Sequence, residues 1–367
     1  MIIAGEVSGD LHGAEVVRAI LRETPETVFS GMGGAAMASA GVDILVDAAS
    51  LSVMGITEVL TRIGPILDGF RIIRRALRAI QPDLLILIDF PDFNLRVARI
   101  AKLLGIRVLY YISPQIWAWR TGRVKTIRKR VDHMAVIFPF ETRFFTGNDV
   151  DVTYVGHPLL DHQWPMVNAP GNDPFPVIGL LPGSRPQEIS RHLPLMLESA
   201  LAIRRHSGPA RFLIGPVDAA QQALAAAMVK AHHATGICDI IDGGARAVFS
   251  RCHLVIAASG TVTLEAAISG VPMVVIYKVS PLSYLLGRVM IRVKFISLVN
   301  LVAGREVVPE LIQKEASPGR ITGKVLEILS QPGRLDTIRR DLADVREILG
   351  TGGAARRVAK IALEMMV

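Results

Sequence analysis

Short, continuous apolar runs alternate with helical patterns along most of the chain. Runs of this kind predict strands that are buried on both faces, as in parallel sheets. A first series is Ile2–Ala4, Leu84–Ile88, Val108–Tyr111, Met134–Phe138 and Thr153–Val155, and a second is Val177–Leu181, Phe212–Ile214, Ile237–Ile241, Leu254–Ala257 and Met273–Tyr277. Helical patterns lie between them, at Leu95–Leu104, Leu193–Arg205, Ala219–Ala231 and Val262–Ser269. The alternation predicts an α/β protein with two Rossmann-like, doubly wound parallel-sheet domains.

The stretch Asp161–Pro176 breaks this rhythm and predicts a linker, because it is rich in proline and glycine. We therefore expect domains at residues 1–165 and 166–334, with C-terminal helices at 335–367 that could pack on either one. Ligands of doubly wound sheets bind beyond the carboxyl ends of the strands. The expected active site is a central cleft that the two domains face.

Composition narrows the classes of function. The chain has 367 residues, half of them hydrophobic, and a net charge of +8. A basic chain suits partners that carry phosphate: nucleotides, nucleic acid or an anionic membrane. Aromatic residues are only 5% of the chain and no nucleic-acid-binding module is evident, which argues against nucleic acid. The two cysteines, Cys238 and Cys252, have no metal-binding or redox spacing and are expected to be buried thiols.

No uncharged apolar run approaches the roughly 18–20 residues of a membrane span, and the chain opens without a signal peptide. We therefore expect a cytoplasmic protein whose membrane contact, if any, is peripheral. The nine histidines form no ligand motif such as His-Glu-x-x-His. We expect no metal and no cofactor.

Two turns of the second half are candidates for phosphate binding. Ser259-Gly260-Thr261 follows a buried strand and opens a helix, whose first free N–H groups favour a phosphate. Glu265, one turn further on, could accept hydrogen bonds from ribose hydroxyls. Gly183-Ser184-Arg185 also leaves a buried strand and enters a helix, where a guanidinium could clamp a diphosphate. The alternatives are an ordinary capped helix start at the first turn and a surface arginine beside a capping serine at the second.

The first half offers a candidate base. Asp89 stands where the apolar run Leu84–Ile88 ends, at the functional edge of the predicted sheet, and could take a proton from a hydroxyl. The Gly5–Asp10 turn, with Ser8 and Gly9, resembles a weak phosphate-binding turn, and capping of the next helix by Ser8 or Asp10 is the alternative. His157 lies close to the linker, either in the cleft or as a hydrogen-bonded structural histidine.

Basic amphipathic stretches suggest a membrane surface. From Ile56 to Ile80, apolar residues that include Ile56, Val59, Leu60 and Ile63 recur at helical spacing among arginines, and Gly64-Pro65 is expected to split the stretch into two helices. A basic amphipathic helix can lie on anionic lipid. For Phe70–Ile80 we favour the alternative, in which the apolar face belongs to the core.

Taken together, the motifs resemble one family. They are Gly5–Asp10, Val53–Ile56 with Glu58-Val59, Asp89–Asn94, Ser113–Arg120, Gly156–Pro158, Leu181–Arg185, Ala258–Thr261 and Asn300–Glu306. From Ala4 to about Leu349 the chain resembles the lipid-A-disaccharide synthases, bacterial glycosyltransferases of the two-Rossmann-domain (GT-B) type. The tryptophan segment Ser113–Arg120 and the asparagine segment Asn300–Glu306 are highly specific, whereas the Ser-Gly-Thr turn is shared with many nucleotide-sugar transferases.

The resemblance implies an inverting transfer of 2,3-diacylglucosamine from UDP-2,3-diacylglucosamine to 2,3-diacylglucosamine 1-phosphate, which gives the β-1,6 lipid A disaccharide and UDP. It implies that the first domain binds acceptor and lipid and the second binds the UDP-sugar. Asp89 would be the base, and the loop with Asn300 and Arg305 would contact the nucleotide together with Arg185, the Ser259–Thr261 turn and Glu265. The apolar residues Met54, Ile56, Val59, Leu60 and Ile63 would contact the acyl chains or the inner membrane. A homodimer is an open alternative to a monomer.

Two other functions use many of the same features. A UDP-N-acetylglucosamine 2-epimerase, or another GT-B nucleotide-sugar enzyme with a water-soluble acceptor, would also need the Ser-Gly-Thr turn and a carboxylate, but no apolar surface beside Asp89. A non-catalytic peripheral protein that binds nucleotide or lipid would have no use for a positioned base.

Overall fold

The computed structural model describes residues 1–50, 63–165, 175–280, 284 and 293–366. These residues form two compact units, residues 1–162 with 351–367, and residues 163–350. The C-terminal helices, whose docking the sequence left open, divide between them: Arg334–Ile348 (α14) belongs to the second unit and Ala354–Met366 (α15) to the first.

The first unit is built on a parallel sheet. Among the described residues its strands are ordered β3-β2-β1-β4-β5-β6-β7. They span Ile2–Ala4 (β1), Phe29–Gly33 (β2), Val42–Asp47 (β3), Leu84–Ile88 (β4), Arg107–Tyr111 (β5), His133–Val136 (β6) and Val152–Tyr154 (β7). The strand order reverses between β1 and β4, where Ile3 is in register with Leu87. In a doubly wound sheet the crevice at such a reversal is the usual place for a ligand.

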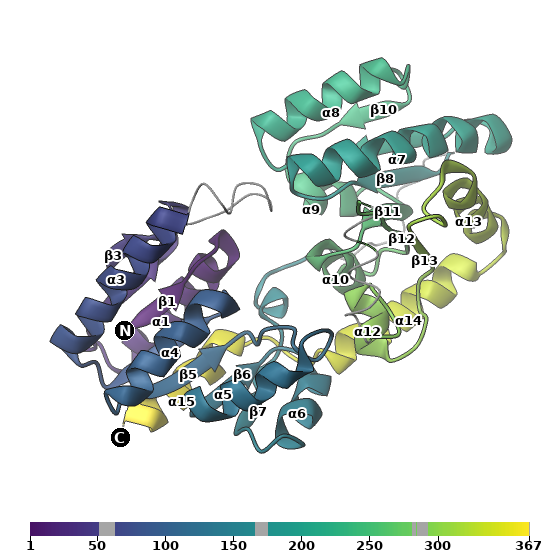
Figure 1. Ribbon diagram of the computed structural model, residues 1–367. Coiled ribbons are helices and arrows are strands. Elements are labelled where there is room, and N and C mark those ends of the chain that lie inside the picture. Colours follow the sequence, from purple (N-terminus) through teal and green to yellow (C-terminus); the bar gives the residue numbers. More distant parts are fainter. Residues whose placement is uncertain (51–62, 166–174, 281–283, 285–292, 367) are drawn as a thin grey trace. The chain divides into compact units, whose positions relative to one another are not determined.

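Helices cover both faces of this sheet (Figure 1). They are Val7–Glu23 (α1), Ala35–Ser39 (α2), Ile63–Ile80 (α3), Pro91–Leu103 (α4), Val124–Arg130 (α5) and Pro139–Thr146 (α6), with 3-10 turns at Ala48–Ser50 (η1), Thr121–Arg123 (η2) and Pro158–Asp161 (η3). Helix α15 packs beside α1. Its Arg357 guanidinium donates to the carbonyl of Val155, just after β7, at 2.7 Å. The break expected at Gly64-Pro65 falls in the first turn of α3, where proline is tolerated; residues 56–62 lie outside the described part of the chain.

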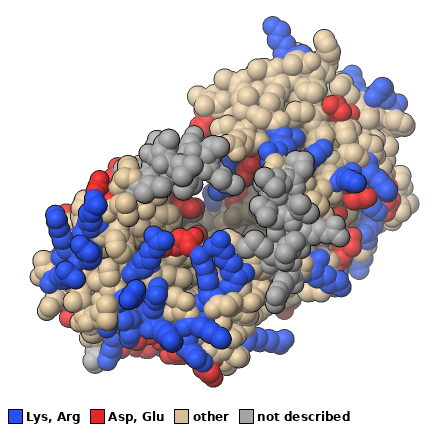
Figure 2. Space-filling view, in the orientation of Figure 1, with Lys and Arg blue, Asp and Glu red and all other residues tan. Residues whose placement is uncertain are grey.

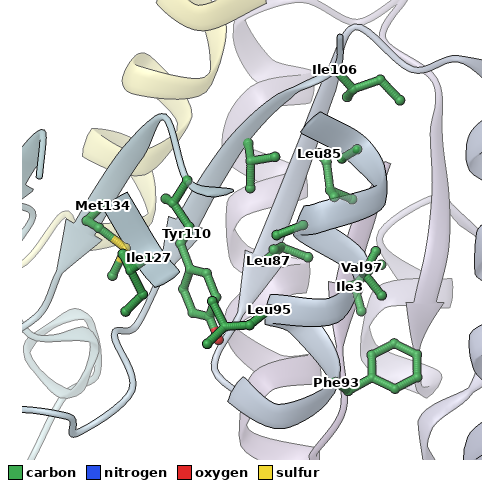
Figure 3. Packing of buried hydrophobic residues seen from close by; sticks show 14 of the residues in the cluster. Ile3, Leu85, Leu87, Phe93, Leu95, Val97, Ile106, Tyr110, Ile127 and Met134 are labelled. Atoms are coloured by element: carbon green, nitrogen blue, oxygen red, sulfur yellow. The ribbon is translucent and has the colours of Figure 1, made fainter. Parts of the chain in front are cut away.

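A core of the first unit lies between its sheet and helices α3, α4 and α5. Leu85 and Leu87 of β4, Tyr110 of β5 and Met134 of β6 pack against α4 and α5, as Figure 3 shows. Strand β4 is buried at every position, which is why it reads as a continuous apolar run. The core thereby fixes the carboxyl end of β4.

The second unit repeats this design. Among its described residues the strands are ordered β10-β9-β8-β11-β12-β13, all parallel, and the order reverses between β8 and β11. They span Val177–Leu181 (β8), Arg211–Ile214 (β9), Cys238–Ile240 (β10), Leu254–Ala258 (β11), Met273–Tyr277 (β12) and Glu310–Ile312 (β13). The helices are Pro186–Ser207 (α7), Ala219–Ala231 (α8), Gly244–Phe249 (α9), Thr261–Ile268 (α10), Leu298–Ala303 (α12), Pro318–Ser330 (α13) and α14. Cys238 and Cys252 are buried free thiols, as expected.

Candidate active site

Asp89 is the first residue after β4, and its backbone is held in an uncommon conformation. Its φ is +45°, and that of Phe90 is +47°, in the left-handed region that side chains other than glycine rarely adopt. The Asp89 N–H donates to the carbonyl of Tyr111 at 3.2 Å. The Asp89 carbonyl accepts from the Tyr110 hydroxyl at 2.6 Å and from the Asn94 amide at 2.7 Å. Three hydrogen bonds thus fix a strained residue at the point where the strand order reverses, a combination typical of functional sites.

The surroundings of the Asp89 carboxyl make it a weak acid. Burial raises its pKa to about 6, the negative charge of Glu6 adds to the rise, and His12 opposes it. The side chain lines a cavity of about 240 Å³ together with Ser113, Trp119 and Glu141. A carboxylate with a pKa near the operating pH suits general base catalysis.

Glu141, which the sequence analysis missed, anchors the wall of this cavity. It is buried, and one carboxylate oxygen accepts from the Ser113 hydroxyl at 2.5 Å and from the Trp117 indole N–H at 2.9 Å. The other oxygen accepts from the backbone N–H groups of Ile137 and Phe138. Burial raises the pKa of the Glu141 carboxyl to about 7. Glu141 thereby ties the tryptophan segment to the start of α6. The sequence did hold a signal for Glu141, because a glutamate in the first turn of a helix that begins with proline often accepts hydrogen bonds from the backbone before the helix.

The Gly5–Asp10 turn is shaped by packing and by capping. A Cβ on Gly5 would lie 2.3 Å from the Phe90 ring, so only glycine allows the end of β4 to close over this turn. Helix α1 starts here with Glu6 as its N-cap, and the buried Gly9 packs against Ala4. Asp10 caps a helix, as the alternative interpretation held, but the helix is α2: its carboxylate accepts from Gly34, Ala36 and Met37. Ser8 is exposed in the first turn of α1.

His157 is a buried, hydrogen-bonded residue. Its Nδ1 accepts from the N–H of Leu159 at 3.2 Å, and its ring lies 5.2 Å from that of Phe138. Burial lowers its pKa to about 3, so the imidazole is neutral at physiological pH. Its contacts fit the structural alternative. The charge of His12 adds to this lowering of the pKa of His157.

In the second unit, Gly183, Ser184 and Arg185 form the turn between β8 and α7. Gly183 has a φ of +117°, and a Cβ there would lie 2.4 Å from a Glu188 carboxylate oxygen. That carboxylate accepts from the backbone N–H groups of Ser184 and Arg185 at 3.1 and 3.3 Å, and pairs with the Arg185 guanidinium at 3.4 Å. Arg185 is 68% exposed. The N–H groups of this turn thus bind an oxyanion, which in this structure is the carboxylate of Glu188.

His192, also missed, holds this turn against the neighbouring strand. Its Nδ1 lies 2.8 Å from the carbonyl oxygen of Pro182, and its Nε2 lies 3.1 Å from the carbonyl oxygen of Lys278, just after β12. The histidine is buried. Because it bridges two chain segments beyond the carboxyl ends of strands, it fixes the position of the turn that carries Arg185.

Ser259, Gly260 and Thr261 connect β11 to α10. Gly260 is the N-cap of α10, and no side chain among the described residues caps this end of the helix. Thr261 is the first residue of the helix and is exposed. The Ser259 hydroxyl donates to the carbonyl of Ile296 at 3.1 Å. Burial raises the pKa of the Glu265 carboxyl and the charge of Arg246 opposes the rise. The Arg246 guanidinium in turn lies 4.3 Å from the centre of the Trp164 ring.

Asn300 and Arg305 are both engaged within the second unit. Asn300 is fully buried; its oxygen accepts from the N–H groups of Val307 and Val308, and its nitrogen donates to Glu310 at 2.8 Å. It therefore holds the loop that contains Arg305. Arg305 pairs with Asp341 at 2.8 Å and Asp344 at 3.5 Å, both on α14. In this arrangement the Asn300 amide is engaged within the chain, whereas the Arg305 side chain is 51% exposed and pairs with the two aspartates through Nη2.

The remaining predicted residues are Met54, Ile56, Val59, Leu60 and Ile63. The first four lie outside the described residues, and only the backbone of Ile63, at the start of α3, is described. No helix in the described part of the chain is both long and apolar enough to cross a bilayer. Among those residues, no group of three or more His, Cys, Asp or Glu side chains is arranged to hold a metal ion.

Comparison with known proteins decides the family. A family model described as lipid-A-disaccharide synthetase matches residues 1–364. The lipid-A-disaccharide synthase of Geobacter sulfurreducens is 48% identical over all of this chain and 97% of its own length. The chain belongs to the lipid-A-disaccharide synthase family. This family member is therefore a glycosyltransferase that forms the lipid A disaccharide, from a nucleotide-sugar donor and an acceptor substrate.

A further relative agrees with this assignment, and a solved structure agrees with the fold. The Coxiella burnetii lipid-A-disaccharide synthase is 40% identical over 98% of the chain and 96% of its own length. A structure of the Neisseria meningitidis UDP-GlcNAc 2-epimerase bound to UDP-GlcNAc has a TM-score of 0.61 and 11% identity, and covers 97% of this chain and 96% of its own. At that identity the likeness shows the GT-B fold alone. The sequence-based prediction of the fold is confirmed, and the lipid A function is favoured over both alternatives.

Proposed function

We propose that this family member transfers 2,3-diacylglucosamine from UDP-2,3-diacylglucosamine to 2,3-diacylglucosamine 1-phosphate, with inversion at the anomeric carbon. The products are the β-1,6 disaccharide 1-phosphate and UDP. The proposal rests on the setting of Asp89. Three hydrogen bonds to its backbone fix this strained residue, its carboxyl has a raised pKa, and the residue lines a cavity.

Asp89 acts as the general base. Above a pH of about 6 its carboxylate accepts the proton of the acceptor's 6-hydroxyl while that oxygen attacks the anomeric carbon. The new C–O bond forms as the bond to UDP breaks, and the electron pair of the broken bond leaves with UDP. A single displacement of this kind gives inversion.

The second unit stabilises the leaving group. Arg185 and the start of α10 at Ser259–Thr261 bind the diphosphate as its charge develops, which requires only donors that are already in position. Glu188 releases the Arg185 guanidinium when a diphosphate competes for it, because an exposed ion pair is worth only about 0–1 kcal/mol. Glu265 accepts hydrogen bonds from the ribose hydroxyls.

The asparagine loop contributes to the same site mainly by position. Asn300 fixes residues 307–308 through its amide and so holds the loop that carries Arg305. This revises the direct contact expected from the sequence. The contact of Arg305 with the nucleotide stays a prediction, since its pairing with Asp341 and Asp344 uses only Nη2 of the guanidinium.

The substrates are lipids, so we also propose that the protein works at the cytoplasmic surface of the inner membrane. The apolar residues Met54, Ile56, Val59, Leu60 and Ile63 would contact acyl chains. Replacement of Val59 or Leu60 by aspartate should lower association with anionic vesicles. Unchanged binding would argue against this contact.

The decisive experiment is mass spectrometry of the products. The protein is mixed with UDP-2,3-diacylglucosamine and 2,3-diacylglucosamine 1-phosphate in detergent micelles, with and without magnesium chelation. We expect the disaccharide 1-phosphate and UDP in both cases, and none with Asp89→Asn. Parallel incubation with UDP-N-acetylglucosamine alone tests the epimerase: a C2-epimerised product without any disaccharide would overturn the proposal.

A further inference from the structure

Five arginines from three helices line one groove of the first unit. Arg74 and Arg78 come from α3, Arg96 and Arg99 from α4, and Arg130 from the end of α5. The groove has a volume of about 590 Å³, and its other lining residues, Phe70, Ile100 and Leu103, are apolar. None of its lining residues is acidic. Figure 2 shows lysine and arginine side chains gathered on the face of the first unit formed by these helices.

Helical spacing explains why the arginines converge. Arg74 and Arg78 are four residues apart, and Arg96 and Arg99 are three apart, so each pair lies on one face of its helix. On α3 the neighbouring face, with Ile73 and Leu77, is fully buried in the core. Helices α3 and α4 pack side by side, with the Phe70 and Phe93 rings 5.8 Å apart, so the two arginine pairs border the same groove.

These charges are not neutralised within the described part of the chain. Arg74, Arg78, Arg96 and Arg99 make no ion pair there, although the same helices carry acids. Those acids pair elsewhere: Asp68 of α3 with Arg71 at 2.6 Å, and Asp92 of α4 with Arg123 at 2.5 Å. A solvated face of mixed charge would interleave the two signs, whereas this groove collects one sign only.

Arg130 is fixed where its charge is unfavourable. Its guanidinium donates to the carbonyl of Leu95 at 2.9 Å, which holds it on the wall that α4 forms. Burial and repulsion by Arg99 both lower its pKa. An anion in the groove would relieve this repulsion, and the planar guanidinium groups are suited to bidentate contact with phosphate oxygens.

The apolar rim narrows the class of ligand. Leu103, which lines the groove, is 77% exposed, and Leu67, two turns before Arg74 on the same face of α3, is 43% exposed. Exposed aliphatic side chains beside uncompensated arginines match the boundary between headgroups and acyl chains. A free nucleotide or a nucleic acid would gain nothing from this rim.

We propose that this arginine groove (Arg74, Arg78, Arg96, Arg99 and Arg130) binds the phosphate headgroup of an anionic phospholipid and so holds the first unit on the membrane. The inference rests on the proposed function only in that lipid substrates give the protein a reason to reside there. It adds a second contact to the apolar one proposed at residues 54–63, since stable attachment generally takes two signals.

The test compares two charge-matched variants in vesicle sedimentation. Arg74→Gln/Arg99→Gln removes two groove charges, and Arg18→Gln/Arg22→Gln removes two exposed charges from α1 of the same unit. With vesicles of phosphatidylcholine and phosphatidylglycerol we expect about 30-fold weaker binding for the groove variant, because each basic residue near an anionic surface contributes roughly five-fold. The α1 variant should bind within two-fold of the wild type, and pure phosphatidylcholine should bind all three weakly. Equal losses for the two variants, or no loss, would overturn the proposal.

Two further measurements separate other ligands and the proposed function. Calorimetry of the wild type with inorganic phosphate should show no saturable site. A saturable phosphate site that is absent from the groove variant, while that variant still binds vesicles normally, would instead make the groove a receptor for a free anion. Disaccharide formation in detergent micelles should be equal in the groove variant and the wild type. A ten-fold higher KM for the acceptor would instead assign the groove to the substrate phosphate. If the wild type forms no disaccharide, the proposed function fails while the vesicle comparison still decides the groove.

Discussion

The carboxyl edges of the two sheets have the same topology but opposite local chemistry. In the first unit the reversal between β1 and β4 carries Asp89, which is strained, partly buried and hard to ionise. In the second unit the reversal between β8 and β11 carries two helix starts and an exposed arginine that an internal carboxylate already pairs. We infer that Asp89 at the first edge accepts a proton, and that at the second edge a diphosphate replaces the Glu188 carboxylate as the partner of Arg185. We infer that one doubly wound design supplies a base in one case and a leaving-group site in the other.

The sharpest test of this division is Asp89→Asn. Asparagine tolerates the left-handed backbone well, so the substitution removes the base and leaves the turn intact. We expect turnover to fall by about 10²–10⁴-fold, the usual contribution of a general base. UDP affinity, measured by calorimetry, should be unchanged if the second unit binds UDP as we propose. Full turnover in the variant would remove Asp89 from the mechanism.

The next largest effect is expected at Glu141, which supports the first edge. Glu141→Ala leaves four donors without their acceptor, three of them buried: the Ser113 hydroxyl, the Trp117 indole and two backbone N–H groups. We expect the free energy of unfolding to fall by roughly 3 kcal/mol, measured by denaturant titration. Glu141→Gln keeps one acceptor oxygen and should lose less. If the alanine variant were as stable as the wild type, the cavity wall would not depend on this carboxylate.

At the second edge, Arg185→Ala should weaken UDP binding by roughly 1.5–3 kcal/mol, the value of a charge-assisted hydrogen bond. Arg185→Lys should recover only part of this, since an ammonium lacks the planar fork. Glu188→Gln should bind UDP at least as tightly as the wild type, because it removes the competing carboxylate. Calorimetry decides among these outcomes, and identical affinities in all three variants would rule out the Arg185 contact.

Patterns that depend on a residue's own neighbours in the chain were predictable, and those that depend on distant neighbours were not. Asp89 could be found because an acid directly follows a buried apolar run. Its left-handed backbone could not, because the Tyr110 hydroxyl that clamps it comes from β5. Strand β2 was missed because its glycines obscure the pattern. A Cβ on Gly31 would lie 1.8 Å from the carbonyl oxygen of Ile2 on β1, so the glycine is required there.

In the second unit, too, contacts made by distant segments of the chain could not be predicted from the sequence. The Gly183–Arg185 and Ser259–Thr261 turns were predicted from their place between a strand and a helix. The internal pairing of Arg185, the burial of Asn300 and the bridge made by His192 were not. Each depends on which side chain meets the turn from another segment, and a single sequence does not encode that pairing as a local pattern.

The smallest predicted effect contrasts stability with activity at Asp89. Its pKa is about 6 in the folded protein against an ordinary 3.8, so the folded state binds its proton more tightly than the unfolded chain does. The resulting stabilisation is complete below a pH of about 3.8 and is lost as the pH rises through 6. Asp89→Asn removes this dependence. We therefore expect the variant to match the wild type near pH 4 and to be more stable by about 1–2 kcal/mol at pH 8, after allowance for partial exposure.

Thermal unfolding of both proteins across this pH range measures the difference, with turnover recorded on the same samples. Wild-type turnover should rise with pH through about 6, because only the ionised carboxylate can accept a proton. An inactive variant whose stability advantage over the wild type grows as the pH rises would show that the charge at this edge is maintained at the expense of folding, as expected of a catalytic residue. A stability difference that did not vary with pH would mean that the strained backbone, rather than the buried charge, distinguishes the first edge from the second.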